Sequence, residues 1–215
     1  MGKKRLEDAI KQINHPIEVT YRCFELDPAM ERDVKENVYE KLARKYGMSI
    51  AQAKANAGNV VQTAKEAGLE FNMDTVIQTN TFDAHRLAVF AQTQGLMKEM
   101  TERILRAYFT DSKHIGDHET LTELAVEVGL NREAVAKMLA SDEMADAVRA
   151  DEQTAQQYNI TGVPFFLIDK KYALTGAQPT DVFVQALKQI IAEDDSAVNQ
   201  DGATCDDDGC EIPEK

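Results

Sequence analysis

The chain has 215 residues, three cysteines and a formal net charge of −13. Three cysteines are too few for a secreted disulfide scaffold of this length, and so acidic a chain is not expected to bind nucleic acid. The sequence has no apolar run of the roughly eighteen residues that a membrane span needs and no charged-then-apolar leader. We therefore expect no membrane partner and a cytoplasmic protein.

The first elements are a helix and a strand. Residues 3–13 carry their apolar side chains on one helical face, and His15-Pro16 then ends the helix. Residues 17–24 alternate between apolar and polar types, which is typical of a strand with one face in the core. Cys23 lies on the apolar face of this predicted strand, where a lone cysteine indicates packing rather than chemistry.

From residue 30 to residue 159 the apolar periodicity is helical throughout. Ser49 and Gln52 form a capping-box pattern at the start of one of these helices. Four glycines stand where helices are expected to end: Gly47, Gly68, Gly95 and Gly129. This part of the chain is predicted to be a helical block inserted between strands.

A strand–turn–strand pattern follows the helical block. Residues 165–168 are apolar, 169–171 are a polar turn, and 172–175 can pair back, so a β-hairpin is predicted. Pro164 is expected at the first position of the first strand, because proline cannot donate a ladder hydrogen bond. An apolar final helix follows at 182–191, and residues 194–215 are predicted to be a disordered acidic tail.

Two segments resemble a known family. Residues 161–166, Thr-Gly-Val-Pro-Phe-Phe, with the hairpin, Gly176 and the last helix, resemble the cis-proline segment of thioredoxin-fold proteins. Residues 80–87, Asn-Thr-Phe-Asp-Ala-His-Arg-Leu, resemble the FrnE-type branch of DsbA-like proteins, whose kin are 2-hydroxychromene-2-carboxylate isomerases and kappa-class glutathione transferases. The resemblance implies a cis peptide between Val163 and Pro164.

The implied fold is α/β, a thioredoxin-like fold with a large α-helical insertion. Its thioredoxin-like domain would be discontinuous, formed by residues 1–29 and 160–193, with an inserted helical domain at 30–159 and a tail at 194–215. We expect the first strand of this fold to be missing from the chain, because residues 1–7 resemble the sequence that follows Cys-x-x-Cys in the family. We therefore expect the catalytic pair just before Met1, an impaired chain, and a segment of the tail or of a second copy in the central sheet position.

The resemblance also assigns binding residues. Thr161, Gly162, Val163 and Pro164 would bind the substrate backbone, with Asn80, His85 and Arg86 facing the same cleft. The alternative for His85 is an ordinary histidine at the start of a helix, where Asn80 or Thr81 would be the cap. His114 and His118 are interpreted as surface residues, because two histidines without a third ligand do not indicate a metal site.

Cys205 and Cys210 form the other cysteine feature. Two thiols separated by four residues can close a small loop, and Gly209 makes the turn easier. The three aspartates between them would raise the thiol pKa values and slow exchange. An accessory disulfide and a solubilising tail with incidental cysteines both remain open.

Three functions are compatible with these features. The first is a FrnE-type thiol-disulfide oxidoreductase that needs no cofactor and acts on thiol- or disulfide-containing proteins or small molecules. The alternative is an isomerase or transferase that uses glutathione, and the third is a redox-silent binding protein. A homodimer is compatible with each of them.

Overall fold

The computed structural model describes the backbone of residues 1–201 and the side chains of residues 1–194. Cys205 and Cys210, with the accessory disulfide predicted for them, lie outside the described residues. The chain forms two compact units, one of residues 18–176 with Met1 and one of residues 2–17 with the chain from Ala177 onward. These units divide the chain at other places than the predicted domains, whose boundaries at 29 and 160 stay a prediction.

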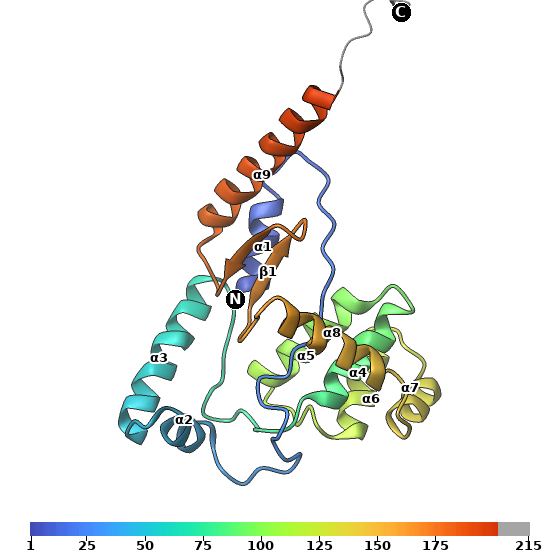
Figure 1. The fold of residues 1–215 in the computed structure, drawn as a ribbon. Coiled ribbons are helices and arrows are strands. Elements are labelled where there is room, and N and C mark those ends of the chain that lie inside the picture. The colour runs from blue at the N-terminus through green and yellow to red at the C-terminus, as the bar shows by residue number, and fades with distance from the viewer. Residues whose placement is uncertain (202–215) are drawn as a thin grey trace, which may run out of the picture. The chain divides into compact units, whose positions relative to one another are not determined.

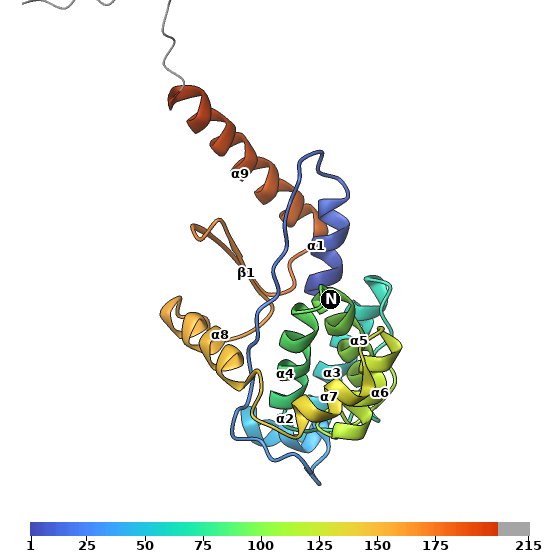
Figure 2. The same ribbon diagram turned by 90° about the vertical axis from the view of Figure 1, so that its right-hand side faces the viewer.

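The smaller unit pairs the two ends of the chain. Helix α1, Gly2–Ile10, lies beside helix α9, Thr180–Asp201 (Figures 1 and 2). Ala9 on α1 and Phe183 on α9 are completely buried, and Arg5 donates a hydrogen bond to the carbonyl of Ala177. Both helices were predicted, although α1 ends three residues earlier than its apolar pattern does.

The larger unit contains a β-hairpin. Strands β1, Phe165–Ile168, and β2, Tyr172–Thr175, are antiparallel, with Phe165 opposite Thr175. Asp169 and Lys170 both have positive φ, as the right-handed twist of a tight hairpin turn requires. The Val163–Pro164 peptide is cis, as predicted.

The predicted strand at 17–24 is wrong. The structure has no strand in this stretch, and the sheet of the described residues has only the strands β1 and β2. A strand exists only where a neighbour supplies hydrogen bonds, and alternation along one segment does not supply one. The inward alternation survives at Cys23 and Glu25, both buried. The filling of the central sheet position by the tail or by a second copy stays a prediction.

Five helices of the larger unit pack together, and the four between residues 82 and 139 supply the helical residues of its main core (Figure 1). The five are α4, Phe82–Gln92; α5, Met97–Phe109; α6, His118–Glu127; α7, Arg132–Leu139; and α8, Ala145–Gln157. Helix α4 contacts α5, α6, α7 and α8 and is buried along most of its length. The side chains without solvent exposure include Leu87, Met100, Leu121, Val135, Met138 and Val148.

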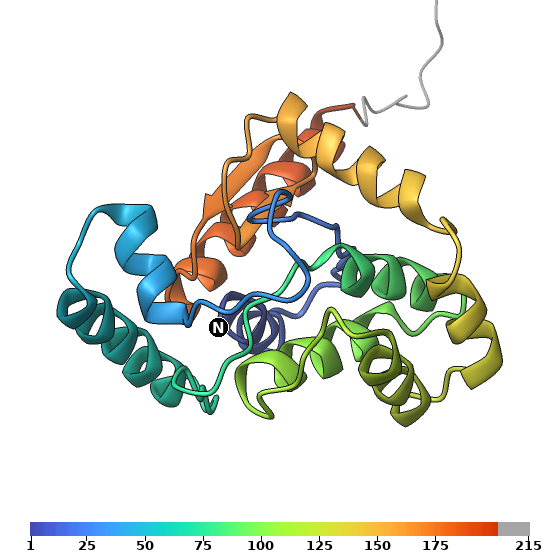
Figure 3. The ribbon, with the colours of Figure 1, turned by 90° about the horizontal axis from the view of Figure 1, so that it is seen from below.

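Two further helices form a hairpin of their own. Helix α2, Val38–Tyr46, and helix α3, Ile50–Glu66, lie side by side (Figure 3). The predicted capping box of Ser49 and Gln52 is confirmed, and α2 begins with a second one, formed by Asn37 and Glu40, that the sequence analysis missed. The glycines predicted to follow helix ends all have positive φ.

The prediction that residues 30–159 are helical throughout is wrong in three long segments. Residues 30–37, 69–80 and 110–117 are irregular. Side chains hold these segments in place of a helical ladder, since Asn72 donates to the carbonyl of Thr110 and Thr79 donates to that of Arg32. Such side-chain bonds offer the backbone an alternative to the helix. Within the described residues, none of the helices is long and apolar enough to cross a membrane.

Gly116 provides a test of the packing in the larger unit. A Cβ at this position would lie 2.0 Å from Oγ1 of the buried Thr79 and 3.2 Å from Cε1 of His114. We expect Gly116→Ala to lower the free energy of unfolding by about 1 to 3 kcal/mol, the usual cost of overpacking.

Urea unfolding followed by circular dichroism measures the effect. The matched control is Gly58→Ala in α3, where an added Cβ meets nothing within 4 Å. This substitution also replaces a glycine inside a helix. This control should stabilise by roughly 0.5 to 1 kcal/mol. Equal and small changes in both variants would contradict the packing described for Gly116.

Candidate functional site

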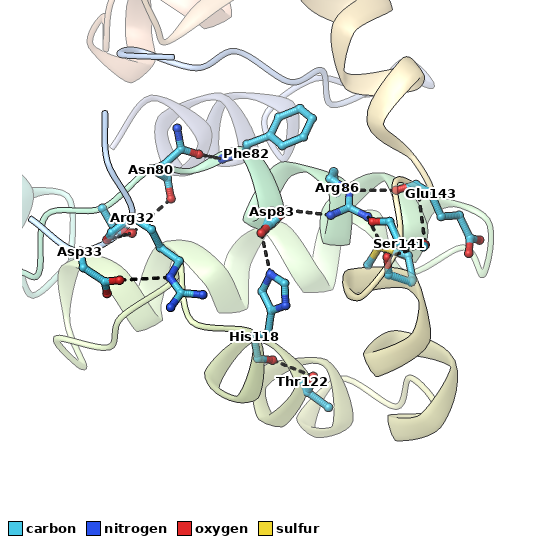
Figure 4. A network of polar contacts seen from close by, with 12 residues as sticks. Arg32, Asp33, Asn80, Phe82, Asp83, Arg86, His118, Thr122, Ser141 and Glu143 are labelled. Carbon is cyan, nitrogen blue, oxygen red and sulfur yellow. Dashed lines mark hydrogen bonds and ion pairs between the residues drawn. The ribbon is translucent and has the colours of Figure 1, made fainter. Parts of the chain in front are cut away.

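Asn80 fixes the start of α4. Its Oδ1 accepts a hydrogen bond from the backbone N–H of Phe82 at 2.8 Å (Figure 4). Its Nδ2 donates to the carbonyl of Met30 at 3.1 Å. Thr81 occupies the N-cap position but makes no side-chain cap bond. Asn80 therefore joins the irregular segment around residue 30 to the helix that carries the other predicted site residues.

Arg86 is buried one turn further along α4, with 4% of its surface exposed. Its guanidinium pairs with Asp83 at 2.7 Å and donates to the carbonyls of Glu143, Met138 and Ser141 (Figure 4). A buried cation is tolerated when a carboxylate and several acceptors surround it. The structure thus uses Arg86 to bind the loop between α7 and α8, and its predicted role toward substrate stays a prediction.

Asp83 also binds a histidine. Nε2 of His118 lies 2.6 Å from Oδ2 of Asp83, and His118 remains 41% exposed, in keeping with the surface position predicted for it (Figure 4). His114 lies 3.4 Å from Asp33. Among the described residues, no group of three or more His, Cys, Asp or Glu side chains is arranged to hold a metal ion.

His85 lies half-buried between α4 and the segment around residue 24. Burial lowers the pKa of His85, while the charge of Glu152, a hydrogen bond with the backbone of Phe24 and the charge of Asp151 act in the opposite direction. The imidazole is therefore held mainly in its neutral form at physiological pH, and it can donate one hydrogen bond and accept another.

Cys23 is 3% exposed, and its Sγ lies 3.8 Å from the carbonyl of His85. Burial raises the pKa of the Cys23 thiol to about 12, and the carboxylate of Asp151 contributes. Because the thiolate is the form that attacks a disulfide, this cysteine is chemically inert near neutral pH. The packing role predicted for Cys23 agrees with this environment, although the strand on which it was placed is absent.

The sequence analysis missed a pair of acids beside Cys23. Nη1 of Arg149 lies 2.7 Å from Oε2 of Glu25 and 2.6 Å from Oε2 of Glu152, and its guanidinium stacks 4.2 Å from the ring of Phe82. The Oε1 atoms of both acids are buried and have no hydrogen-bond partner in the described structure. Burial raises the pKa of Glu25, a hydrogen bond from Arg149 opposes this, and a hydrogen bond with Glu152 adds to it. The sequence did contain a signal for Glu25, because it follows Cys23 by two residues and so falls on the same inward face of the alternating segment.

The loop 161–164 connects α8 to β1. Val163 is 47% exposed, and the carbonyl of Pro164 accepts a hydrogen bond from Gly176 at 2.8 Å. The structure places Asn80 just before α4 and His85 and Arg86 on its first turns, but no described hydrogen bond or ion pair joins them to this loop. The shared cleft predicted for the two groups stays a prediction.

Comparison with known proteins decides the family. A family model described as a DSBA-like thioredoxin domain matches residues 1–188. The chain belongs to this family. The DsbA-like thioredoxin fold is here rich in helices, as the sequence predicted.

Two relatives of this DsbA-like chain are informative. The crystal structure of the probable DsbA oxidoreductase SCO1869 from Streptomyces coelicolor is similar with a TM-score of 0.85 and 38% sequence identity, over 99% of this chain and 93% of that one. The uncharacterized protein YwbO of Bacillus subtilis (strain 168) is 28% identical over 189 residues, which are 87% of this chain and 88% of YwbO.

The raised pKa of Glu25 gives a prediction on stability. The folded state keeps a proton on Glu25 that the unfolded chain releases above the ordinary value of 4.5, so unfolding should become easier as the pH rises from 4.5 through the folded-state pKa. We expect Glu25→Gln, which keeps a neutral group, to gain stability relative to the parent chain over that window.

Urea denaturation at a series of pH values from about 4 upward tests this, because the linkage acts only between the unfolded-state and the folded-state pKa of Glu25. The control is Glu119→Gln, which removes an exposed carboxylate paired with Arg132 on the surface. If the difference between Glu25→Gln and the parent chain does not change with pH, the assignment of the proton to Glu25 is wrong.

A second prediction concerns the Cys23 thiol. We expect it to resist iodoacetamide in the folded protein at neutral pH, because it is buried and its pKa is raised to about 12. Mass spectrometry of the Cys23 peptide measures its alkylation before and after unfolding in urea. Rapid alkylation in the native protein would show that the thiol is accessible and reactive.

Proposed function

We propose that this chain is a thiol-disulfide oxidoreductase of the FrnE type, acting on cysteines of proteins or of small molecules. The observation that carries the proposal is the family match over residues 1–188, supported by the similarity to a probable DsbA oxidoreductase. As part of the same proposal, the protein acts in the cytoplasm and uses no cofactor.

The reaction is an exchange between sulfur atoms. A thiolate attacks one sulfur of a disulfide, the S–S bond breaks, and the second sulfur leaves as a thiolate, which gives a mixed disulfide. A second thiolate then attacks the mixed disulfide and releases the first product. The described residues contain one cysteine, Cys23, whose buried thiol is not suited to this step.

The thiols must therefore come from elsewhere. Cys205 and Cys210 are present in the sequence but outside the described residues. By resemblance, a Cys-x-x-Cys pair is also expected before Met1. Both sources enter the experiment below.

The loop 161–164 supports a binding role. The backbone groups of Thr161, Gly162 and Val163 make no described backbone hydrogen bond, and Val163 is nearly half exposed. Free N–H and C=O groups on an exposed loop can pair with an extended peptide, as happens when a strand is added to a sheet edge. Under the proposal, this loop holds the substrate backbone while sulfur exchange takes place beside it.

The test is catalysis of disulfide reduction in a protein substrate, with dithiothreitol as the electron donor. The 215-residue chain is compared with a chain extended by the in-frame codons upstream of Met1, and with the variant Cys205→Ser/Cys210→Ser. Cys23→Ala is the matched control, since Cys23 is buried. We expect low activity from the 215-residue chain, a large gain from an extension that carries Cys-x-x-Cys, and no effect of Cys23→Ala.

Three results would contradict parts of the proposal. Full activity from the 215-residue chain, without a gain from the extension, would show that no upstream pair is used. Loss of that activity in Cys205→Ser/Cys210→Ser would assign the chemistry to the tail cysteines. No reduction by either chain would reject the oxidoreductase.

A further inference from the structure

The α2–α3 hairpin encloses an apolar hollow of about 400 Å³. Its wall is formed by side chains of both helices and of the segments beside them: Leu42, Tyr46, Met48, Ala57, Val60 and Met73. Asn56, also in the wall, donates to the sulfur of Met48 at 3.5 Å. Apart from this amide and the hydroxyl of Tyr46, the side chains of the wall are apolar or thioethers.

No other helix or strand of the larger unit packs against α2 or α3 within the described residues. Figure 3 shows the two helices side by side, in blue and teal. Tyr46 is 61% exposed, Ile50 49% and Val60 40%. Exposed apolar residues gathered around a hollow mark interaction surfaces more often than scattered ones do.

The hairpin also differs from the rest of the chain in charge. Residues 38–66 contain five basic and two acidic side chains, a net charge of +3 in a chain whose total is −13. Arg44 is paired with Glu36, and Lys41 is paired with Asp27. The remaining lysines of these helices, which have no carboxylate partner in the described structure, are Lys45, Lys54 and Lys65.

Two of these lysines stand beside aromatic rings of the hairpin. Lys45 lies over the ring of Tyr46 at 5.8 Å, and Lys54 lies over the ring of Tyr39 at 5.3 Å. Tyr46 is itself part of the wall, so a positive charge stands next to the apolar surface. The surface therefore combines an apolar hollow with cations that lack counter-ions.

We propose that the α2–α3 hollow is the docking site for an amphipathic helix of a partner protein, one that carries acidic residues beside its apolar face. A groove between two helices accepts the apolar side chains of a third helix at helical spacing, and methionine adapts to the shapes presented to it. The lysines supply complementary charge, which favours an acidic partner over a basic one.

Two other occupants fit the surface less well. A bilayer surface is flat on the scale of two helices and would leave the hollow unfilled. A second copy docked through the same surface would bring lysines against lysines, since the two sides of a two-fold interface are identical. The docking proposal does not depend on thiol chemistry, so it holds or fails separately from the proposed oxidoreductase function.

The experiment uses the full chain and two fluorescent helical peptides of the same length. In one peptide leucines at helical spacing are combined with glutamates, and in the other the glutamates are replaced by lysines. Fluorescence anisotropy should show binding of the acidic peptide, with the basic peptide weaker by about tenfold or more. The affinity for the acidic peptide should fall as salt is added.

Variants locate the binding site. Val60→Glu and Tyr46→Glu each place a charge in the hollow and should weaken the acidic peptide by about tenfold or more. Val126→Glu on α6 is the matched control, because Val126 is 41% exposed and Val60 is 40% exposed. Lys54→Glu should weaken binding at low salt and have little effect at high salt. Circular dichroism confirms that each variant is folded.

Several results would overturn the proposal. Equal binding of both peptides would contradict the preference for an acidic partner. Unchanged binding in Val60→Glu and Tyr46→Glu would show that the peptide does not bind in the hollow. Self-association that Tyr46→Glu abolishes, without peptide binding, would assign the surface to a second copy. Binding to anionic lipid vesicles, without peptide binding, would assign it to a membrane. Peptide binding that appears only after truncation at Asp201 would assign it to the tail of this chain.

Discussion

The buried guanidinium of Arg86 is the interaction on which the larger unit depends. Arg86 is a residue of α4 whose guanidinium pairs with Asp83. It also donates hydrogen bonds to three carbonyls between the end of α7 and the start of α8. Removing one partner from a buried, paired charge costs about 3 to 5 kcal/mol, a large part of a domain's stability. The bonds of Arg86 therefore fix the direction in which the chain enters α8, and with it the position of every residue that α8 carries.

Helix α8 in turn sets the chemistry of the segment around Cys23. Asp151 accepts the backbone N–H of Cys23 at 2.8 Å, and Arg149 holds Glu25. Burial raises the pKa of the Cys23 thiol, and the charges of Asp151 and Glu152 add to this. The same side chains act on His85, whose pKa burial lowers. This region is a polar interior that keeps the segment in place without a strand neighbour.

The sequence predicted what is decided locally. The hairpin, the cis bond before Pro164, the capping box at Ser49 and the glycines that follow helices all depend on residues within a few positions of one another. The strand at 17–24 failed because pairing depends on a distant neighbour. Arg86 was singled out by resemblance, but its partners lie up to 57 residues away, and Glu25 meets Arg149 across 124 residues. One sequence does not contain the information that would join such positions.

The arrangement of Glu25, Arg149 and Glu152 has a consequence for how the chain can vary. One cation serves two carboxylates, and the buried Glu25 has 1% of its side chain exposed. A change of Arg149 to a neutral residue leaves two acids facing each other without a counter-charge. If one of the two acids is also changed to glutamine, this repulsion between neighbouring negative charges does not arise. Substitutions at the three positions should therefore be interdependent, and an alignment of relatives should show them changing as a set.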